Sequence, residues 1–281
     1  MFAYMGGKNV HTKWISPWIP SNFKTYVEVF GGAMWVYWKS DKVPVETNVY
    51  NDFNRHLSNI FQCASTQPAR FREVLESYVI HLHNDDVFEE YKNEVFLYFD
   101  KDFTIPNVEL AAKYIFCQTQ TFAGNTNLTR DSKIYKHPTE TAQGKPYTQK
   151  YNSFINKLKD SDYLKKLDRL SVENMDCREL IKKYDSKDTF FYIDPPYYNM
   201  ESYYTSHDFG HDDHMELCEM LKTTKGRWAL SYYHFDELGT LFPRHQYEWH
   251  HERTYSVNAR TTEAVRIELL IMNYKTGLSF L

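Results

Sequence analysis

The stretch Thr189-Phe190-Phe191-Tyr192-Ile193-Asp194-Pro195-Pro196-Tyr197 decides the fold of this 281-residue chain. Its first five residues are continuously apolar or aromatic, apart from the β-branched threonine, as expected for a central strand of a parallel sheet covered on both faces. The two prolines cannot extend the hydrogen-bond ladder, so they predict a rigid turn at the carboxyl end of the strand. Ligand sites of open α/β sheets lie at that edge. We therefore expect a site around Asp194.

Segments on both sides of this strand predict further parts of the same sheet. Residues 25–30 predict a strand that ends in Gly31-Gly32, and a second predicted strand, residues 43–50, ends in the polar turn 51–54. A helix is predicted after each, over residues 33–39 and 55–62. This alternation predicts a Rossmann-like α/β fold with a mostly parallel sheet. The later predicted elements are strands at 171–175, 227–231 and 265–274 and a helix at 214–222.

The middle third of the chain has a different pattern. Helical periodicity marks residues 86–99 and 108–122, and a polar segment rich in Thr, Lys, Asn and Gln follows over residues 124–149. Loops of that length in a compact domain are commonly functional. We predict a catalytic domain of residues 1–66 and 164–281, interrupted by a mainly helical insertion, residues 67–163.

Charge and composition narrow the function classes. A net charge of −4 argues against a wholly basic nucleic-acid binder. Residues 129–169 nevertheless contain ten Lys and Arg against five Asp and Glu, a local charge of +5. A surface that binds phosphates has such a charge, and so does a solvated helix face.

Targeting and metal signals are weak. No apolar stretch approaches the roughly 18–20 residues of a membrane span, and the N-terminus has no secretory pattern. The four cysteines form no CxxC pair, so we expect reduced packing residues of a cytoplasmic protein. A histidine and aspartate cluster, His207, His211 and His214 with Asp208, Asp212 and Asp213, is compatible with a metal site. Capping of a helix by Asp212 or Asp213 explains it better, and we predict no metal.

The groups at the proline turn suit a particular guest. The Asp194 carboxylate and the Pro195 carbonyl are two acceptors, which match an amino group carrying two hydrogens. The Tyr197 ring offers a stacking surface for a planar base. The turn therefore predicts an amino-bearing nucleobase as the substrate.

Motifs along the whole chain resemble one family. They are the aromatic-x-Gly-Gly-Lys run Tyr4 to Lys8, the loop Val27 to Gly32, Asn51-Asp52-Phe53-Asn54, Asp194-Pro195-Pro196-Tyr197 and the closing strand Glu268-Leu-Leu-Ile-Met-Asn-Tyr274. In this content and order the chain resembles the Dam-like (D12 class) DNA adenine-N6 methyltransferases, in the alpha arrangement. The resemblance implies S-adenosyl-L-methionine as cofactor. The residues it implies as cofactor contacts are Tyr4, Lys8, Glu28, Phe30, Gly31, Gly32, Asp52 and Asp176.

The resemblance also implies a mechanism. The target adenine of double-stranded DNA swings out of the stack into the pocket, and its N6 takes the methyl group directly. The catalytic set would be Asp194, Pro195, Pro196 and Tyr197. Residues 67–163 would be the target-recognition region, with DNA contacts expected from Asn125, Asn127, Arg130, Lys133, Lys136 and Lys145. The segment 118–125 departs from the pattern of members that read GATC, so that specificity is not carried over.

Three other functions fit part of the pattern. DNA cytosine-N4 and RNA adenine-N6 methylation also present an amino-bearing planar base to Asp194-Pro195-Pro196-Tyr197. A non-catalytic DNA-binding relative would have lost acids such as Asp52 and Asp194, which are present here. We expect a bacterial or phage-encoded cytoplasmic enzyme, with a cognate restriction nuclease as a candidate partner. A stand-alone enzyme would have the same sequence features.

Overall fold

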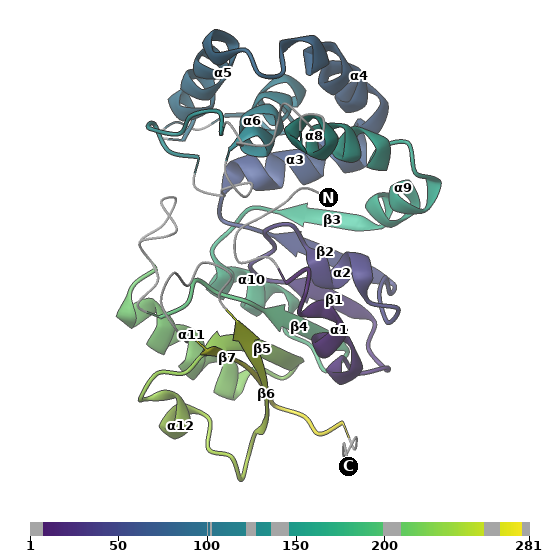
Figure 1. Cartoon of the computed structure of the whole chain (residues 1–281). Coiled ribbons are helices and arrows are strands. Elements are labelled where there is room, and N and C mark those ends of the chain that lie inside the picture. Colours follow the sequence, from purple (N-terminus) through teal and green to yellow (C-terminus); the bar gives the residue numbers. More distant parts are fainter. Residues whose placement is uncertain are drawn as a thin grey trace. The chain divides into compact units, whose positions relative to one another are not determined.

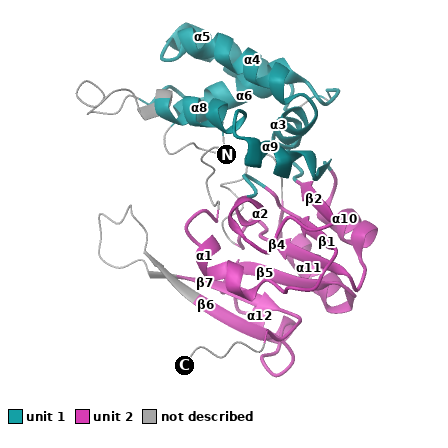
Figure 2. Ribbon diagram, turned by 90° about the vertical axis from the view of Figure 1, so that its right-hand side faces the viewer, with its two compact units in different colours: residues 1–7, 32–34, 52–174 teal, residues 8–31, 35–51, 175–281 magenta. Residues whose placement is uncertain are grey.

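The computed structural model describes residues 8–99, 101, 103–121, 128–135, 146–198, 209–255 and 265–276. These residues form two compact units, coloured separately in Figure 2. Unit 1 contains residues 32–34 and 52–174 within those limits, and unit 2 contains residues 8–31, 35–51 and the described residues from 175 onward. Each unit is described by itself.

Unit 2 is built on a mostly parallel sheet (Figure 1). Its strands follow the order β2-β1-β4-β5-β7-β6. Strands β1, β2, β4 and β5 run parallel, β7 pairs antiparallel with β5, and β6 pairs antiparallel with β7 at the end of this order. Their bounds are β1 Thr25–Glu28, β2 Thr47–Asn51, β4 Thr189–Ile193, β5 Arg227–Tyr233, β6 Glu248–Tyr255 and β7 Val265–Met272.

The strand order creates a switch point between β1 and β4. The chain passes from β1 to β2 on one side, whereas β4 is followed by β5 on the other. At such a point the connections leave the two strands in opposite directions, which opens a crevice beyond their carboxyl ends. Glu28 is paired with Tyr192 across this boundary, so the segments after Glu28 and after Ile193 emerge at the same edge. The Asp194 turn therefore stands at the expected ligand position.

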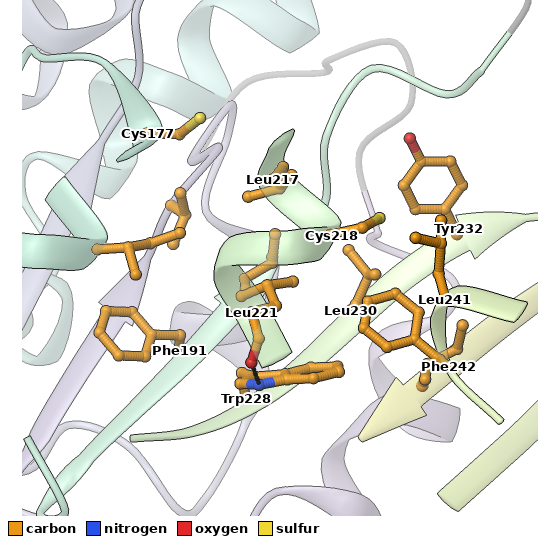
Figure 3. Close-up of a cluster of buried hydrophobic side chains, with 14 of the residues drawn as sticks. Cys177, Phe191, Leu217, Cys218, Leu221, Trp228, Leu230, Tyr232, Leu241 and Phe242 are labelled. Carbon is orange, nitrogen blue, oxygen red and sulfur yellow. Dashed lines mark hydrogen bonds between the residues drawn. The ribbon is translucent and has the colours of Figure 1, made fainter. Parts of the chain in front are cut away.

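Alternate residues of the central strands face opposite layers. Val27, Val49 and Phe191 belong to a core cluster with helices α10 (Cys177–Tyr184) and α11 (His211–Thr223). Figure 3 shows this cluster, in which Trp228 packs beneath α11 and its indole Nε1 donates to the Leu221 carbonyl at 2.9 Å. The residues between these positions, which point to the other face of the sheet, are buried as well, so the central strands are covered on both faces.

The opposite layer of unit 2 contains shorter helices. Tyr26 stacks on Tyr37 of α2 (Trp35–Lys39) and contacts Phe190 of β4. The other short elements of unit 2 are α1 (Thr12–Ile15), η1 (Ser16–Trp18) and α12 (Leu238–Leu241), of which α12 belongs to the cluster with α10 and α11. The two layers together hold both faces of the sheet away from water, which explains the continuous apolar run in β4.

Unit 1 is mainly helical. Its elements are α3 (Arg55–Thr66), α4 (Pro68–Tyr78), η2 (Val79–His81), α5 (Asp85–Leu97), α6 (Val108–Gln120), α8 (Pro146–Lys157), α9 (Ser161–Asp168) and β3 (Leu170–Glu173). Helix α6 lies at the centre, in contact with α3, α4, α5 and α8. It is buried on almost every side, since its sequence is apolar around most of its circumference.

Asparagine caps set the starts of three helices in unit 1. Asn54, Asn84 and Asn107 each accept a hydrogen bond from a backbone N–H in the first turn of α3, α5 and α6. Such caps satisfy N–H groups that have no partner within the helix and typically stabilise it by about 1 kcal/mol. These boundaries are therefore encoded locally.

Several predicted boundaries shift for physical reasons. Strand β2 begins at Thr47 rather than Val43, because Pro44 has no N–H to donate to a ladder. Helix α2 begins at Trp35, after Gly32 and Met34, which both have positive φ. Helix α8 begins at Pro146, inside the segment predicted as a loop; proline suits a first helical position. Helices α4, α9 and α10 and strand β6 were not predicted.

Two further sequence predictions are confirmed. Asp213 takes part in capping α11: from the third helical position its Oδ2 accepts the N–H of Gly210, the N-cap residue, at 2.9 Å. All four cysteines are buried free thiols. Among the helices of the described ranges, none combines the length and apolar character of a membrane span.

Unit 1 also buries a histidine whose two ring nitrogens have no hydrogen-bond partner among the residues that the structure describes. His56 is 1% exposed and lies against the rings of Phe99, Phe103 and Tyr114 at centroid distances of 4.5, 5.1 and 5.3 Å. Burial lowers the pKa of His56 to about 3. The imidazole is therefore neutral in the folded state at every pH near neutrality.

This environment predicts a pH-dependent loss of stability. Below about pH 6.5, His56 binds a proton in the unfolded chain but stays neutral in the folded chain. The free energy of unfolding therefore falls as the pH decreases from 6.5 towards 3. The His56→Phe variant lacks this proton uptake and should exceed the wild type by about 2 kcal/mol more at pH 5 than at pH 8. Urea unfolding at the two pH values measures the difference. A His56→Gln control should show the same weaker dependence of the free energy of unfolding on pH. A pH dependence equal to that of the wild type in both variants would contradict the lowered pKa of His56.

Candidate active site

Two carboxylates meet at the carboxyl edge of the unit 2 sheet. Asp194 directly follows β4, and Glu268 on β7 is paired with Tyr233, the last residue of β5. Because β7 runs antiparallel to β5, its early residues reach the edge where β4 and β5 end. Glu268 is 1% exposed and Asp194 is half-buried.

A lysine from the start of the described chain lies between these carboxylates. Lys8 Nζ is 2.8 Å from Asp194 Oδ1 and 3.2 Å from Glu268 Oε1. The ammonium also donates to the Tyr197 hydroxyl, which in turn donates to Glu268 Oε1. Lys8 is 5% exposed. Four side chains from three distant segments of the chain thus form one buried polar cluster.

The Tyr197 ring is held on several sides. Its centroid lies 5.8 Å from that of Tyr232 and 4.2 Å from that of Tyr233. Lys8 Nζ lies 4.7 Å from the ring centroid, within the range of a cation–π contact. The ring therefore already accommodates a cationic nitrogen close to the Asp194 carboxylate.

The cluster changes the acidity of Asp194. Burial raises the pKa of Asp194 to about 6; the Lys8 ammonium opposes the rise, and the Glu268 carboxylate adds to it. Near neutral pH the Asp194 carboxylate is ionised and can accept hydrogen bonds from a nitrogen that gains positive charge.

The loop after β1 is shaped mainly by packing inside unit 2. Glu28 accepts a hydrogen bond from the Tyr26 hydroxyl at 2.7 Å, and burial raises the pKa of Glu28 to about 8. Phe30 is half-buried and contacts Phe209 edge-on. A Cβ atom at Gly31 would lie 2.3 Å from the Tyr50 ring and 2.8 Å from the Asn51 carbonyl. Gly31 is thus required by its own neighbours.

Asp52 follows β2 in the chain and lies in unit 1. Its Oδ2 accepts the Gly32 N–H and its Oδ1 accepts the Asn54 N–H, each at 2.8 Å. Each carboxylate oxygen retains a lone pair for a further donor. Burial raises the pKa of Asp52 to about 6, and the two backbone N–H groups oppose the rise. Two fixed oxygens suit a diol such as a ribose.

Comparison with known proteins identifies the family to which a chain with this site belongs. The family model of D12 class N6 adenine-specific DNA methyltransferases matches residues 4–260. The chain belongs to this family. The match includes the Lys8 segment, the Asp52 turn and the Asp194 turn.

Three relatives support the assignment. The type II methyltransferase M.CviBI of Paramecium bursaria Chlorella virus NC1A is 19% identical over 80% of this chain and 78% of its own length. The type II methyltransferase M.MjaIII of Methanocaldococcus jannaschii is 24% identical over 79% and 78%, respectively. The modification methylase StsI of Streptococcus sanguinis is 25% identical over 77% of this chain but only 31% of its own length. This chain is thus a DNA methyltransferase of the adenine-N6 class.

In this D12 methyltransferase, Asp176 has a structural role that the sequence did not reveal. It caps α10 by accepting the Arg178 N–H at 2.8 Å, and its carboxylate receives the Arg178 side chain through Nε at 2.8 Å and Nη2 at 2.7 Å. Arg178 in turn contacts Asp213 and Glu216 of α11. These hydrogen bonds with Arg178 lower the pKa of Asp176, although partial burial opposes the shift.

The predicted DNA contacts are described in part. Arg130 and Lys133 are exposed in unit 1, and the Arg130 guanidinium lies 5.3 Å from the Phe96 ring centroid. Four predicted DNA contacts lie outside the described residues: Asn125, Asn127, Lys136 and Lys145. One predicted cofactor contact, Tyr4, also lies outside them.

Two histidines of the predicted histidine and aspartate cluster are each bonded to a tyrosine hydroxyl instead. His211 Nδ1 is 3.0 Å from the Tyr198 hydroxyl, and His214 Nδ1 is bonded to the Tyr232 hydroxyl. His207 and Asp208 lie outside the described residues. Within the residues that are described, no three His, Cys, Asp or Glu side chains are grouped as metal ligands.

The sequence predictions did not include Glu268 in the methyltransferase site. One signal was present: Glu268 is the acid of the otherwise apolar run Leu269-Leu270-Ile271-Met272 in the closing strand. A buried strand rarely contains an acid without a partner. The identity of that partner, Lys8, lies 260 positions away and needs the fold.

Proposed function

We propose that this D12 methyltransferase transfers a methyl group to N6 of an adenine flipped out of double-stranded DNA, with Asp194, Pro195, Pro196 and Tyr197 as the catalytic set. One observation carries the proposal. The Asp194 carboxylate, at the carboxyl end of a central strand and beside an aromatic ring, binds a cationic nitrogen at 2.8 Å. A nitrogen that becomes cationic is what N6 methylation generates.

The protein's residues act on the target amine. Asp194 and the Pro195 carbonyl accept the two N6 hydrogens, which aims the nitrogen lone pair out of the plane of the ring. The N–C bond forms as the C–S bond of the donor breaks, and the bonding electrons stay on sulfur. The cationic N6 then loses one proton to the Asp194 carboxylate. Asp194 stabilises the positive charge that develops in the transition state more than it stabilises the neutral amine.

S-adenosyl-L-methionine supplies the electrophilic methyl group when it is bound. The donor set fits a nucleoside: Asp52 presents two oxygens to a diol, and Gly32 is fixed against it. We propose Tyr4, Lys8, Glu28, Phe30, Gly31, Gly32, Asp52 and Asp176 as the cofactor contacts. For Asp176 this requires a ligand to share its carboxylate with Arg178. Gly31 and Glu28 would contribute to cofactor binding through the shape of the backbone, since Gly31 is packed against Tyr50 and Asn51 and the Glu28 side chain is bonded to Tyr26.

Target recognition is proposed for the insertion, residues 67–163. The local charge of +5 over residues 129–169 supports it, as do the exposed cations Arg130 and Lys133. Asn, Gln and Arg side chains can form bidentate contacts to purine edges. A cognate restriction nuclease is proposed as a partner because two relatives are named type II methyltransferases and one a modification methylase. We propose action on DNA in the cytoplasm of a bacterial or phage-infected cell.

Phosphate contacts predict a steep salt dependence of DNA affinity. Each phosphate neutralised contributes about −0.9 to the slope of log K against log salt concentration, so the Arg130→Ala and Lys133→Ala variants should each flatten the slope by about 1. Fluorescence anisotropy at increasing KCl concentration measures the slope. The Lys182→Ala control removes a cation of α10 that is paired with Glu179, and it should leave the slope unchanged. Slopes equal to wild type in all three variants would contradict contacts by Arg130 and Lys133.

The reaction itself has a direct assay. The protein is incubated with duplex DNA and S-adenosyl-L-methionine labelled in its methyl group, and the DNA is digested to nucleosides and separated by chromatography. The label is expected in N6-methyldeoxyadenosine. Label in N4-methyldeoxycytidine, or label transferred to structured RNA but not to DNA, would replace the proposal by one of its alternatives.

A further inference from the structure

Lys8 contacts the carboxylate that the proposed reaction uses. Its ammonium lies 2.8 Å from Asp194 Oδ1 and takes up one of the acceptor positions of that carboxylate. At this distance the ammonium would also repel a target nitrogen that gains positive charge at the same carboxylate. Transfer is therefore favoured when Lys8 moves away from Asp194 and remains a buried cation.

Glu268 is placed to receive that cation. Its Oε1 is 3.2 Å from Lys8 Nζ, so a small displacement of the ammonium shortens this contact as the contact with Asp194 lengthens. The cost of an unpaired buried charge is high, and a second carboxylate within reach removes it. We infer that Glu268 is a positioning residue that takes over the Lys8 ammonium and so frees Asp194 for the target amine.

The balance of charge in the cluster points the same way. Two carboxylates face one ammonium, so the cluster carries one excess negative charge when both acids are ionised. That excess stabilises a second cation, the methylated N6, at the Asp194 position. With Glu268 neutralised, Lys8 alone would balance Asp194, and the cluster would no longer favour a further positive charge.

Glu268 also fixes the aromatic ring of the site. The Tyr197 hydroxyl donates to Glu268 Oε1 and accepts from Lys8. A glutamine at position 268 retains an oxygen acceptor for the Tyr197 hydroxyl but loses the charge that attracts Lys8. The Glu268→Gln substitution therefore separates the charge of the side chain from its shape and from its support of Tyr197.

The test compares wild type, Glu268→Asp and Glu268→Gln, with folding checked by circular dichroism and thermal unfolding. The inference rests on the proposed adenine-N6 transfer, so single-turnover transfer to duplex DNA with saturating cofactor is the assay. Glu268→Gln should lower the rate constant about tenfold. Glu268→Asp should lower it less, because aspartate keeps the negative charge on a side chain that is one methylene group shorter. The Kd for S-adenosyl-L-methionine, measured by calorimetry, should stay within about twofold.

A pH profile distinguishes this role from mere support of the fold. The described groups that interact electrostatically with Asp194 are Lys8, Glu268 and Tyr197, together with Tyr192 on β4 itself and Glu28 on the neighbouring strand β1. Since the Glu268 charge raises the pKa of Asp194, its removal should move the acid limb of the rate profile to lower pH, most in Glu268→Gln and less in Glu268→Asp. The Glu248→Gln control on β6, where the carboxylate is bonded to His250, should change neither rate nor limb.

Each outcome decides the question. If Glu268→Gln does not fold, the comparison of wild type with Glu268→Asp still tests the order of the rates and of the acid limbs. A folded variant with wild-type rate and unmoved limb overturns the role of Glu268, as does a lost rate with an unmoved limb. Failure of the wild type to methylate adenine overturns the proposed function itself, and the role of Glu268 with it.

Discussion

Replacing Asp194 by asparagine is expected to lower the rate constant of methyl transfer by about 100- to 1,000-fold, the usual cost of removing a charged group aimed at the transition state. Asparagine preserves the size of the side chain and one acceptor oxygen, but it removes the charge that stabilises a cationic N6. It also removes the acceptor of the N6 proton. Cofactor affinity should survive, because the proposed cofactor acids are unchanged.

The matched control lies at the opposite end of the same strand. Asp188 immediately precedes β4 and is exposed, so Asp188→Asn should retain the wild-type rate. Single-turnover kinetics give the rate and calorimetry gives cofactor binding. Activity of Asp194→Asn within tenfold of wild type would refute the catalytic role of this carboxylate.

The Gly31→Ala substitution is expected to destabilise the protein by about 3 kcal/mol, at the upper end of the usual cost of overpacking. The added Cβ would lie 2.3 and 2.7 Å from two atoms of the Tyr50 ring and 2.8 Å from the Asn51 carbonyl. Tyr50 is fully buried, and Asn51 O accepts the Gly31 N–H, so neither neighbour can move away without loss. The midpoint of urea unfolding measures the effect without any ligand.

Gly239→Ala is the control for this substitution. Nothing lies within 4 Å of a Cβ at Gly239 in α12, and alanine is the better helix former, so stability should stay the same or rise slightly. A Gly31→Ala variant as stable as wild type would show that the glycine serves only approach to a ligand. Such a result would contradict the packing role described above.

The parts of the fold that the sequence predicted are those with a local cause. Strand β4 has the predicted bounds because an apolar run ends at two prolines. Helices α5 and α6 begin at asparagine caps, close to the predicted starts. Strand β6 was not predicted, since Glu248-Trp249-His250-His251 at the side of a sheet shows no apolar run. Its pairing with β7 makes it a strand.

The site was predictable where a motif lies beside a strand end, and not where it depends on distant contacts. Asp194 and Asp52 follow predicted strands, so their positions at strand ends could be expected. The sequence predicted Lys8 as a cofactor contact, but its ion pairs with Asp194 and Glu268 join three distant segments. Likewise, Arg178, the partner of Asp176, forms ion pairs with Asp213 and Glu216 that depend on α10 and α11 lying together.

The most direct test of the central claim is a crystal structure with a sulfonium cofactor analogue and a duplex bearing the target adenine. The account predicts the adenine N6 within hydrogen-bond distance of Asp194 and of the Pro195 carbonyl, beside the Tyr197 ring, with the Lys8 ammonium moved onto Glu268. A sulfonium centre at the opposite edge of the sheet, or an extruded base that leaves the Lys8–Asp194 ion pair intact, would contradict it.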